Sequence, residues 1–167
     1  MGRTFMRTDQ EIIALYEKYV DMVYRICFSY LKNTFDTEDA VQDTFIKLIR
    51  HSKSFASPNH EKAWLIVTTV NTCKDALRRC KNQDVPLDEY ADCLATFDTD
   101  PASRDILDAV CALPPKYKST VYLYYYEGYS SGEIASFLHK PASTIRNYLH
   151  EARALLKKQF GGDWNER

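Results

Sequence analysis

Glycine is scarce in this sequence, with five residues in 167, and no Gly-rich phosphate-binding loop is present. The five cysteines are odd in number and form neither a C-x-x-C pair nor a Cys/His cluster, so neither a disulfide framework nor a zinc site is expected. No apolar run approaches the roughly 20 residues of a membrane span, and no signal-peptide pattern occurs. We therefore expect a cytoplasmic protein with no membrane insertion, no metal and no cofactor.

The formal net charge is only -1, but the charges are unevenly distributed. Residues 1–80 hold 12 basic and 10 acidic side chains, residues 81–101 hold one and six, and residues 102–167 hold nine and seven. Two nearly neutral blocks therefore flank an acidic segment. This distribution predicts weak binding to free nucleic acid, with a partner supplying the remaining affinity.

Strand signals are weak throughout, whereas apolar residues recur at helical spacing. Helices are predicted over residues 10–32, 37–52, 61–81 and 102–112, followed by a Tyr-rich helix that ends at Glu127. The segment SKSFASPNH over residues 52–60 has the composition of a loop. The predicted fold is all-α, with two small helical domains over residues 1–81 and 102–167 and an acidic linker over residues 82–101.

The segment from Gly128 to Lys158 has the pattern of a helix-turn-helix. Ser130 and Glu133 have the S-x-x-E spacing of a capping box, which predicts the start of a short helix. Pro141 suits the first position of the next helix, because its missing N–H has no partner there. The second helix has one apolar face, formed by Ile145, Leu149, Ala152 and Leu156.

The other face of this second helix is polar and carries Ser143, Arg146, Asn147, His150 and Arg153. Such side chains can reach base edges and phosphates in a DNA major groove. Over residues 140–158 five basic side chains stand against one acid, Glu151. The alternative interpretation is an antiparallel helix pair with a solvated polar face, but the short turn and the charge balance favour DNA binding.

Acidic residues gather near the start of the helix predicted over residues 37–52. Stabilisation of the helix dipole explains one or two of them, at a few tenths to about 1 kcal/mol each. The remainder form a polar stripe with Gln42, opposite the face of Phe45 and Leu48, that is available to a partner. A carboxylate metal site is disfavoured because no histidine lies at ligand spacing.

The segment over residues 62–81 combines an aromatic residue, a polar middle and a basic end. Lys74, Arg78, Arg79 and Lys81 fall within two turns, which is compatible with following a phosphate backbone. Asn71 lies on the face of Arg78 and can bond an unstacked base. Phe55, His60 and Trp64 could line a pocket for a flipped base. For Trp64, packing in the core is the slightly favoured alternative.

Taken together, these motifs resemble the extracytoplasmic-function sigma factors of bacteria, in order and over nearly the whole chain. DTEDAVQDTFIKLIR (36–50) is similar to the helix of that family that binds the polymerase clamp. AWL at 63–65, Asn71, Asp75 and Arg78-Arg79 are similar to its −10-element helix. LPPKYKSTVYLYYYEGYSSGEIASFL (113–138), followed by STIRNYLHEARALLKK, is similar to its −35-reading domain.

The resemblance implies a protein that binds core RNA polymerase and promoter DNA, with an anti-sigma factor as a further partner. It implies clamp contacts from Asp36, Glu38, Asp39, Gln42, Asp43 and Phe45. It implies −10 contacts from Phe55, His60, Trp64, Asn71, Lys74, Arg78 and Arg79. At the −35 element it implies base contacts from Ser143, Thr144, Arg146, Asn147 and His150, and phosphate contacts from Arg153, Lys157 and Lys158.

Some positions depart from the family pattern. Val70 stands where an arginine is common, and His139 replaces the usual turn glycine, although histidine is among the residues enriched at positive φ. Tyr148 and Glu151 stand where basic residues are common. These departures bear on the strength and sequence of the −35 contact.

Two other classes of function stay open on the sequence. One is a stand-alone helix-turn-helix regulator, which needs tight operator binding without polymerase and so conflicts with the weak net charge. The other is a catalytic nucleic-acid protein that uses the carboxylates of residues 36–43 with a divalent metal. Neither a histidine cluster nor a phosphate loop supports it, and we expect the protein not to be an enzyme.

Overall fold

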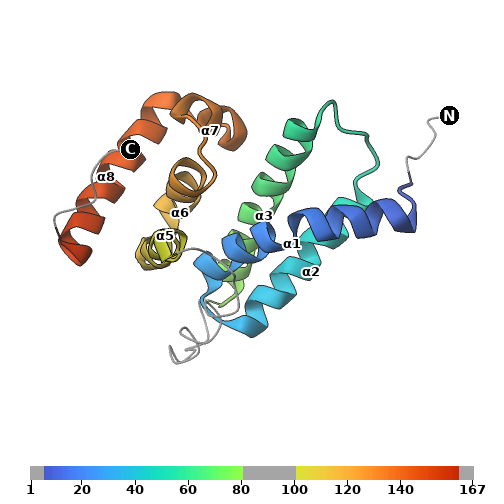
Figure 1. Cartoon of the computed structure of the whole chain (residues 1–167), viewed down its shortest axis with the longest axis horizontal. Coiled ribbons are helices and arrows are strands. Elements are labelled where there is room, and N and C mark those ends of the chain that lie inside the picture. Colours follow the sequence, from blue (N-terminus) through green and yellow to red (C-terminus); the bar gives the residue numbers. More distant parts are fainter. Residues whose placement is uncertain (1–5, 81–100, 162–167) are drawn as a thin grey trace. The chain divides into compact units, whose positions relative to one another are not determined.

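A computed structural model describes residues 6–80 and 101–161, and within these ranges the protein consists of helices and loops, as the all-α prediction requires (Figure 1). The chain divides into two compact units, Met1–Cys93 and Leu94–Arg167. The acidic linker predicted over residues 82–101 lies outside the described residues, except for Pro101, which begins a helix. Each unit is described by itself.

The described part of unit 1, residues 6–80, is built from three helices that each pack against the other two: α1 (Asp9–Leu31), α2 (Thr34–Arg50) and α3 (Pro58–Cys80). The predicted apolar stripes form its core, with Val23, Leu48 and Leu65 almost fully buried. Each such side chain contributes about 1.5–3 kcal/mol of hydrophobic stabilisation. The core sits between the three helices, so the outer faces of α2 and α3 are left exposed.

The ends of α1 and the start of α2 are set by local polar bonds. Thr8 and Glu11 form a capping box before α1, and Lys32 ends that helix in the left-handed region at φ 60°. The side chain of Asn33 then accepts the backbone N–H of Asp36 at 2.8 Å. Such a cap is worth about 1 kcal/mol. It starts α2 three residues earlier than the sequence pattern predicts.

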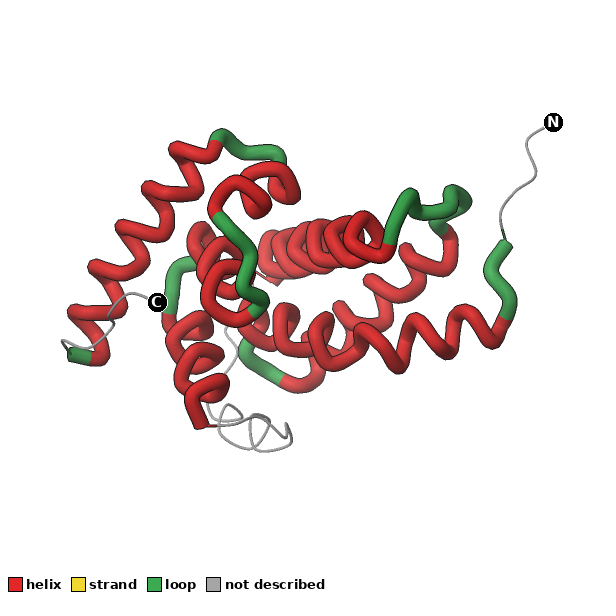
Figure 2. The backbone as a smooth tube through the Cα atoms, turned by 45° about the horizontal axis from the view of Figure 1, so that its top comes forward, coloured by secondary structure: helices red, strands yellow, loops and turns green. Residues whose placement is uncertain are grey.

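The 51–57 loop joins α2 to α3. It is shorter than predicted, because α3 already begins at Pro58, where proline fits the first helical turn. The Ser57 hydroxyl accepts the backbone N–H of His60 at 3.2 Å, which closes that first turn. Figure 2 shows this loop at the same end of unit 1 as the segment that leads into α1.

Unit 2 contains α5 (Pro101–Ala112), α6 (Pro115–Val121), the π-helical turn η1 (Tyr122–Tyr126), α7 (Ser131–Leu138) and α8 (Ala142–Phe160). α8 packs against α6 and α7, while η1 contacts α5 and α7. Leu123, Ile134 and Ile145 are fully buried where these elements meet. Their burial fixes α8 on the unit by one apolar face.

The Tyr-rich helix predicted to end at Glu127 does not stay α-helical. The N–H of Glu127 bonds the carbonyl of Tyr122 at 3.2 Å, and the N–H of Tyr129 bonds that of Leu123 at 3.0 Å. These wide turns give the π-helical segment η1, a rare form that occurs mostly as a single turn within an α-helix. The rings of Tyr122 and Tyr126 stack at 5.0 Å within it. The sequence pattern contains no signal for this widening.

The helix-turn-helix has the predicted turn. Ser130 and Glu133 form both bonds of the capping box, at 3.2 and 2.8 Å, and His139 has φ 53° at the turn. α8 begins at Ala142, so Pro141 precedes the helix and is not its first residue as predicted. The carbonyl of Pro141 instead accepts the N–H groups of Thr144 and Ile145. The backbone oxygen of Pro141 therefore accepts the first hydrogen bonds of the helix.

Candidate nucleic-acid interface

The polar face predicted for α8 is open in the structure. Ile145, Leu149, Ala152 and Leu156 are all buried, which confirms the apolar face. The opposite side chains are exposed: Ser143, Arg146, Asn147, His150, Lys157 and Lys158. Thr144 is half-buried beside them. A row of hydrogen-bond donors on an exposed helix that follows a tight turn has the form of a major-groove reading surface.

Arg153, which the sequence predicts on the same face, is half-buried and engaged by residues of its own unit. Its Nε donates to the hydroxyl of Tyr125 at 2.7 Å, and its guanidinium lies 5.9 Å from the ring centre of Tyr124. Both tyrosines belong to η1. Arg153 therefore ties the middle of α8 to the π-helical turn, a role that depends on contacts 28 residues apart in the chain.

A second set of contacts holds the other side of α8. The hydroxyl of Tyr117 on α6 donates to Glu151 at 2.6 Å, and Lys116 lies 3.7 Å from the same carboxylate. The tyrosine bond first, and the lysine charge second, hold the pKa of Glu151 below its ordinary value. The one acid on this helix is thus compensated within the unit.

Tyr148 belongs to the same cluster. Its ring meets that of Tyr117 edge to face at 5.6 Å, and the ammonium groups of Lys116 and Lys140 lie 5.2 and 5.9 Å from its centre. The side of α8 that departs from the family pattern therefore gathers two lysines around a tyrosine. Sequence reasoning identified Tyr148 and Glu151 but missed Lys116 and Tyr117, because the pairing spans two helices.

In unit 1 an aromatic cluster surrounds Phe55 of the 51–57 loop. The Phe55 ring lies parallel to His51 at 4.8 Å, tilted against Trp64 at 5.5 Å and edge-on to His60 at 5.7 Å. Phe55, His60 and Trp64 therefore do lie together, as predicted. Trp64 is half-buried, so it supports this cluster in addition to packing against the helices.

A pocket of about 500 Å³ opens on the α1 side of the loop. Its wall contains Arg7, Glu11, Ala14, Leu15, Glu61 and residues 54–58 of the chain. Phe55 contributes to this wall, but His60 and Trp64 do not. Its volume falls within the usual range of small-ligand sites. Of the three aromatic residues predicted to line a pocket for a flipped base, only Phe55 therefore borders this pocket.

Along α3 the polar side chains divide between two faces. Asn71, Asp75 and Arg78 are exposed on one face, and Arg78 pairs with Asp75 at 3.2 Å. This confirms that Asn71 and Arg78 share a face. The exposed pair contributes little stability, about 0–1 kcal/mol, so Arg78 can exchange its partner readily. Lys74 is half-buried beside this row. Val70 is buried in the core, which explains why an apolar residue stands there.

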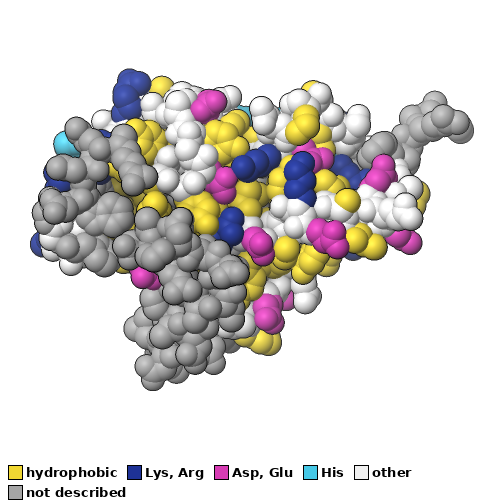
Figure 3. Space-filling model, viewed as in Figure 1, with side chains coloured by type: hydrophobic (Ala, Val, Ile, Leu, Met, Phe, Trp, Pro, Cys, Tyr) yellow, Lys and Arg dark blue, Asp and Glu magenta, His cyan; other side chains and the backbone are white. Residues whose placement is uncertain are grey.

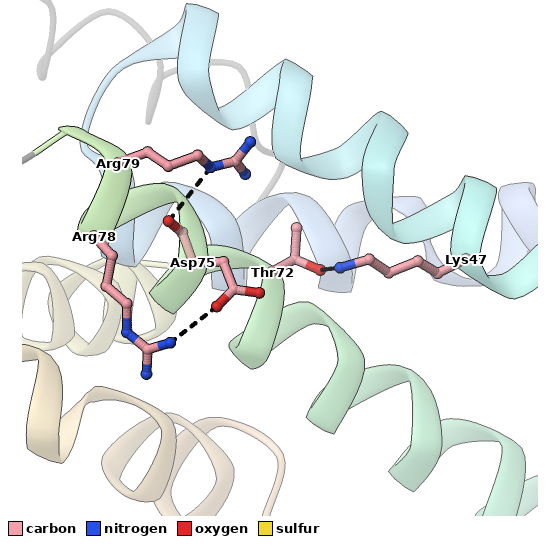
Figure 4. Close-up of polar contacts among 5 residues, drawn as sticks. All are labelled: Lys47, Thr72, Asp75, Arg78 and Arg79. Atoms are coloured by element: carbon pink, nitrogen blue, oxygen red, sulfur yellow. Dashed lines mark hydrogen bonds and ion pairs between the residues drawn. The ribbon is translucent and has the colours of Figure 1, made fainter.

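Arg79 lies on the side of α3 that faces α2, and Figure 4 shows it pointing away from Arg78. It borders a groove of about 140 Å³ with Asp36, Asp39, Asp43, Thr72 and Ala76. Lys47 of α2 donates to the Thr72 hydroxyl at 2.9 Å further along the same two helices. Arg79 is therefore next to the acidic stripe of α2 and outside the row of Asn71 and Arg78.

The acidic stripe on α2 extends beyond what helix capping requires. Asp36 alone lies in the first turn, whereas Glu38, Asp39 and Gln42 are exposed further along the helix. Phe45 is 7% exposed and packs against Tyr16 at 4.8 Å, so it supports this surface from beneath. On the described part of the face in Figure 3, basic and acidic side chains are interspersed, without one broad basic patch.

Neither a metal centre nor a membrane span is found in the described parts of the chain. Among residues 6–80 and 101–161, no group of three or more His, Cys, Asp or Glu side chains is placed to hold a metal ion. No described helix is long and apolar enough to cross a bilayer.

Two family sequence models match the chain, one on each unit. Sigma-70 region 2 matches residues 15–83, and sigma-70 region 4 matches residues 103–156. Among curated proteins, the RNA polymerase sigma factor SigV of Bacillus subtilis is 31% identical over 82% of this chain and 83% of its own length. The ECF RNA polymerase sigma factor SigW of the same organism is 28% identical over 91% and 90%.

Among solved structures, the fold is similar to that of the sigma factor RpoE from Bartonella quintana, determined in complex with the anti-sigma factor NepR. The TM-score is 0.66, and the match covers 92% of this chain and 99% of that one at 19% sequence identity. This likeness concerns the fold. The region 2 match contains α2 and α3, and the region 4 match contains α8 as far as residue 156.

Proposed function

The chain belongs to the extracytoplasmic-function group of RNA polymerase sigma factors, and on that premise we propose how its surfaces divide the recognition of polymerase and promoter. As a sigma factor it binds core RNA polymerase and directs promoter-specific initiation. The observation that carries the proposal is the order of the two matches, with region 2 on unit 1 and region 4 on unit 2, each over a unit with its own polar surface.

The acidic stripe of α2 is the proposed polymerase-binding surface. Glu38, Asp39 and Gln42 are exposed, and Asp36 and Asp43 line the groove beside them. Carboxylates that exceed the needs of the helix dipole favour a basic partner surface, which they attract over a distance and orient on contact. Phe45 contributes through packing, because it is buried beneath the stripe.

The 51–57 loop and the face of α3 that carries Asn71 and Arg78 form the proposed −10 surface. Removing one base from the DNA stack costs a few kcal/mol, which a binding pocket must offset. The pocket of about 500 Å³ beside Phe55 has room for such a base. Lys74 and Arg78 lie further along α3 and would contact phosphates of the same strand away from this base, whereas Arg79 lies on the side of the helix that faces α2.

The open face of α8 is the proposed −35 reading surface. Ser143, Arg146, Asn147 and His150 point away from the core and can reach base edges in the major groove, with Thr144 at the start of the helix. Lys157 and Lys158 at the far end contact phosphates and set the register without specifying sequence. Arg153 acts indirectly by holding α8 against η1.

Two further parts of the proposal concern partners and location. An anti-sigma factor is a candidate partner, since the RpoE structure of similar fold holds NepR. A protein that works with core polymerase belongs in the cytoplasm. No catalytic step is assigned to the chain itself, because the polymerase performs the chemistry.

Footprinting of genomic promoter fragments tests the proposal against the stand-alone regulator. The chain alone, core polymerase alone and the two together are compared on the same fragments. We expect discrete protection upstream of transcription starts only when both proteins are present. Equally strong and specific footprints from the chain alone would favour the regulator, which reads DNA with unit 2 and does not need polymerase.

A further inference from the structure

Arg7 lies just before α1 and connects that segment to the end of α2. One nitrogen of its guanidinium, Nη1, donates to the carbonyl of Leu48 at 2.9 Å and to that of His51 at 2.8 Å. The last carbonyls of an α-helix lack partners within the helix, and a cation at that end is favoured by the helix dipole. α2 ends without a glycine, on His51 in an extended conformation. Arg7 therefore satisfies the carbonyls at the point where the 51–57 loop begins.

The same guanidinium also reaches the middle of the loop. It lies 5.4 Å from the ring centre of Phe55, within the range of a cation–π contact. Phe55 is in turn packed against His51, His60 and Trp64. One side chain thus contacts the first residue of the loop through its carbonyl and the aromatic centre of the loop through its ring. Both contacts together define where Phe55 lies.

The contacts of Arg7 matter for the pocket beside Phe55, because Arg7 and Phe55 both line it. Arg7 forms part of its wall with Glu11, Ala14 and Leu15 of α1, and loop residues 54–57 form the facing side. Where the pocket separates α1 from the loop, apolar packing between the two cannot fix the loop. The contact between the Arg7 guanidinium and the Phe55 ring joins two parts of the pocket wall, so the shape of the pocket depends on Arg7.

We propose that Arg7 is a positioning residue that sets the conformation of the 51–57 loop for capture of an unpaired −10 base. The inference rests on the proposed function of that loop. Arg7 acts through the loop in this assignment, because its Nη1 donates to the carbonyls of Leu48 and His51 and its guanidinium lies against the Phe55 ring. A planar guanidinium can bond two carbonyls while covering a ring, whereas the compact ammonium of lysine cannot reproduce this geometry.

The test measures base capture by the holoenzyme, assembled from core polymerase and the full chain. The probe is a fluorescent single-stranded oligonucleotide with the non-template −10 sequence of a promoter mapped by transcription, together with a series that carries one abasic site at a time. For the wild type we expect one position where the abasic site weakens binding about tenfold, since a stacked base contributes on that order. Arg7→Ala should reduce this penalty to less than about threefold.

Matched variants separate positioning from folding and from charge. Arg50→Ala removes an exposed cation at the same end of α2 and should keep the wild-type penalty. Arg7→Lys should behave like Arg7→Ala, although it keeps the charge. Co-elution with core and binding to −35 duplex should be unchanged in every variant. If Arg7→Ala fails to fold, as judged by circular dichroism, Arg7→Lys is scored by the same criterion.

Three results would overturn the inference. A full penalty at the same position in Arg7→Ala and Arg7→Lys would show that Arg7 does not position the loop. A loss of core binding that parallels the loss of oligonucleotide binding would show that Arg7 supports the acidic surface of α2 instead. If the wild type has no sensitive position yet still gives protein-dependent transcripts, base capture by the loop fails while the sigma function stands.

Discussion

Helices α3 and α8 both carry basic residues that we assign to promoter contacts, but they are embedded differently. α8 buries one face against α6 and α7, and its exposed polar row runs from Ser143 to His150 and resumes at Lys157 and Lys158. α3 packs against both α1 and α2, so its polar residues divide between the open face of Arg78 and the groove of Arg79. A helix with one buried side presents a single surface, whereas a helix with two packed sides can serve two partners.

The difference extends to how each region is held. α8 is fixed from its flanks by contacts on the surface, through Arg153 with Tyr125 on one side and Glu151 with Tyr117 and Lys116 on the other. The 51–57 loop is held from one end by Arg7 and from within by aromatic packing. We therefore expect unit 2 to read DNA with a preformed surface, and unit 1 to depend on the conformation of one loop.

The largest effect is expected on the acidic stripe of α2. The double variant Asp39→Lys and Asp43→Lys reverses two carboxylates on the proposed polymerase surface and should abolish co-elution with core polymerase. The helix content by circular dichroism should be preserved, because Asp39 is exposed and Asp43 is half-buried. Glu17→Lys with Asp21→Lys reverses two exposed acids on α1 and is the matched control. Undiminished co-elution of the first double variant would remove this surface from the polymerase interface.

The next effect tests whether α8 presents one reading surface. Arg146→Ala should cost about 1–3 kcal/mol of promoter binding and relax the preference at a single −35 position. Lys157→Ala is the comparison. Loss of its phosphate contact at the far end of α8 should weaken binding to all −35 sequences alike and reduce the salt slope of binding by about one. Binding of holoenzyme to a library with a randomised −35 element measures both. If Arg146→Ala weakens binding to all −35 sequences equally, Arg146 contacts a phosphate and not a base.

A smaller effect tests the division of α3 between two faces. Arg78→Ala should reduce the salt slope of promoter binding by holoenzyme by about one, as expected when one phosphate contact is lost. Arg79→Ala should leave that slope unchanged, because Arg79 lies with the carboxylates of α2. It should instead make the association with core polymerase more dependent on salt, since the acidic stripe loses its neighbouring cation. Equal slopes in the two variants would mean that both arginines face DNA.

The smallest effect concerns the contacts that flank α8. The carboxylate of Glu151 has a lowered pKa, chiefly because Tyr117 donates to it, so this contact is present above the ordinary glutamate pKa and is lost as the pH falls through the lowered one. Tyr117→Phe removes the bond and should raise the pKa of Glu151 toward the ordinary glutamate value. Titration of the Glu151 carboxyl by NMR measures the change, with Tyr148→Phe as the control. An unshifted pKa would show that the tyrosine does not hold this acid.

The sequence was sufficient for those parts of the structure that depend on local periodicity. The apolar stripes predicted the helices of both units, and the spacing of Ser130 and Glu133 predicted the capping box that starts α7. The exposed row of α8 followed from the same 3.6-residue period, because the buried side of that helix is a single stripe.

The parts that were missed depend on contacts distant in the sequence. Arg7 meets Leu48 and His51 across 41 and 44 residues, and Arg153 meets Tyr125 across 28, so no local motif reveals either. Arg78 and Arg79 are neighbours in the chain, but consecutive residues point about 100° apart around a helix, which places them on different faces. The start of α2 was missed because Asn33 caps it ahead of its apolar stripe.

The central claim, that this chain is a sigma factor, is tested most directly by run-off transcription on fragmented genomic DNA, using cognate core polymerase with and without the protein. The account predicts new discrete transcripts that depend on the protein, with start sites that share a −35 and a −10 motif. The absence of such transcripts, together with specific footprints from the protein alone, would contradict it and favour a stand-alone regulator.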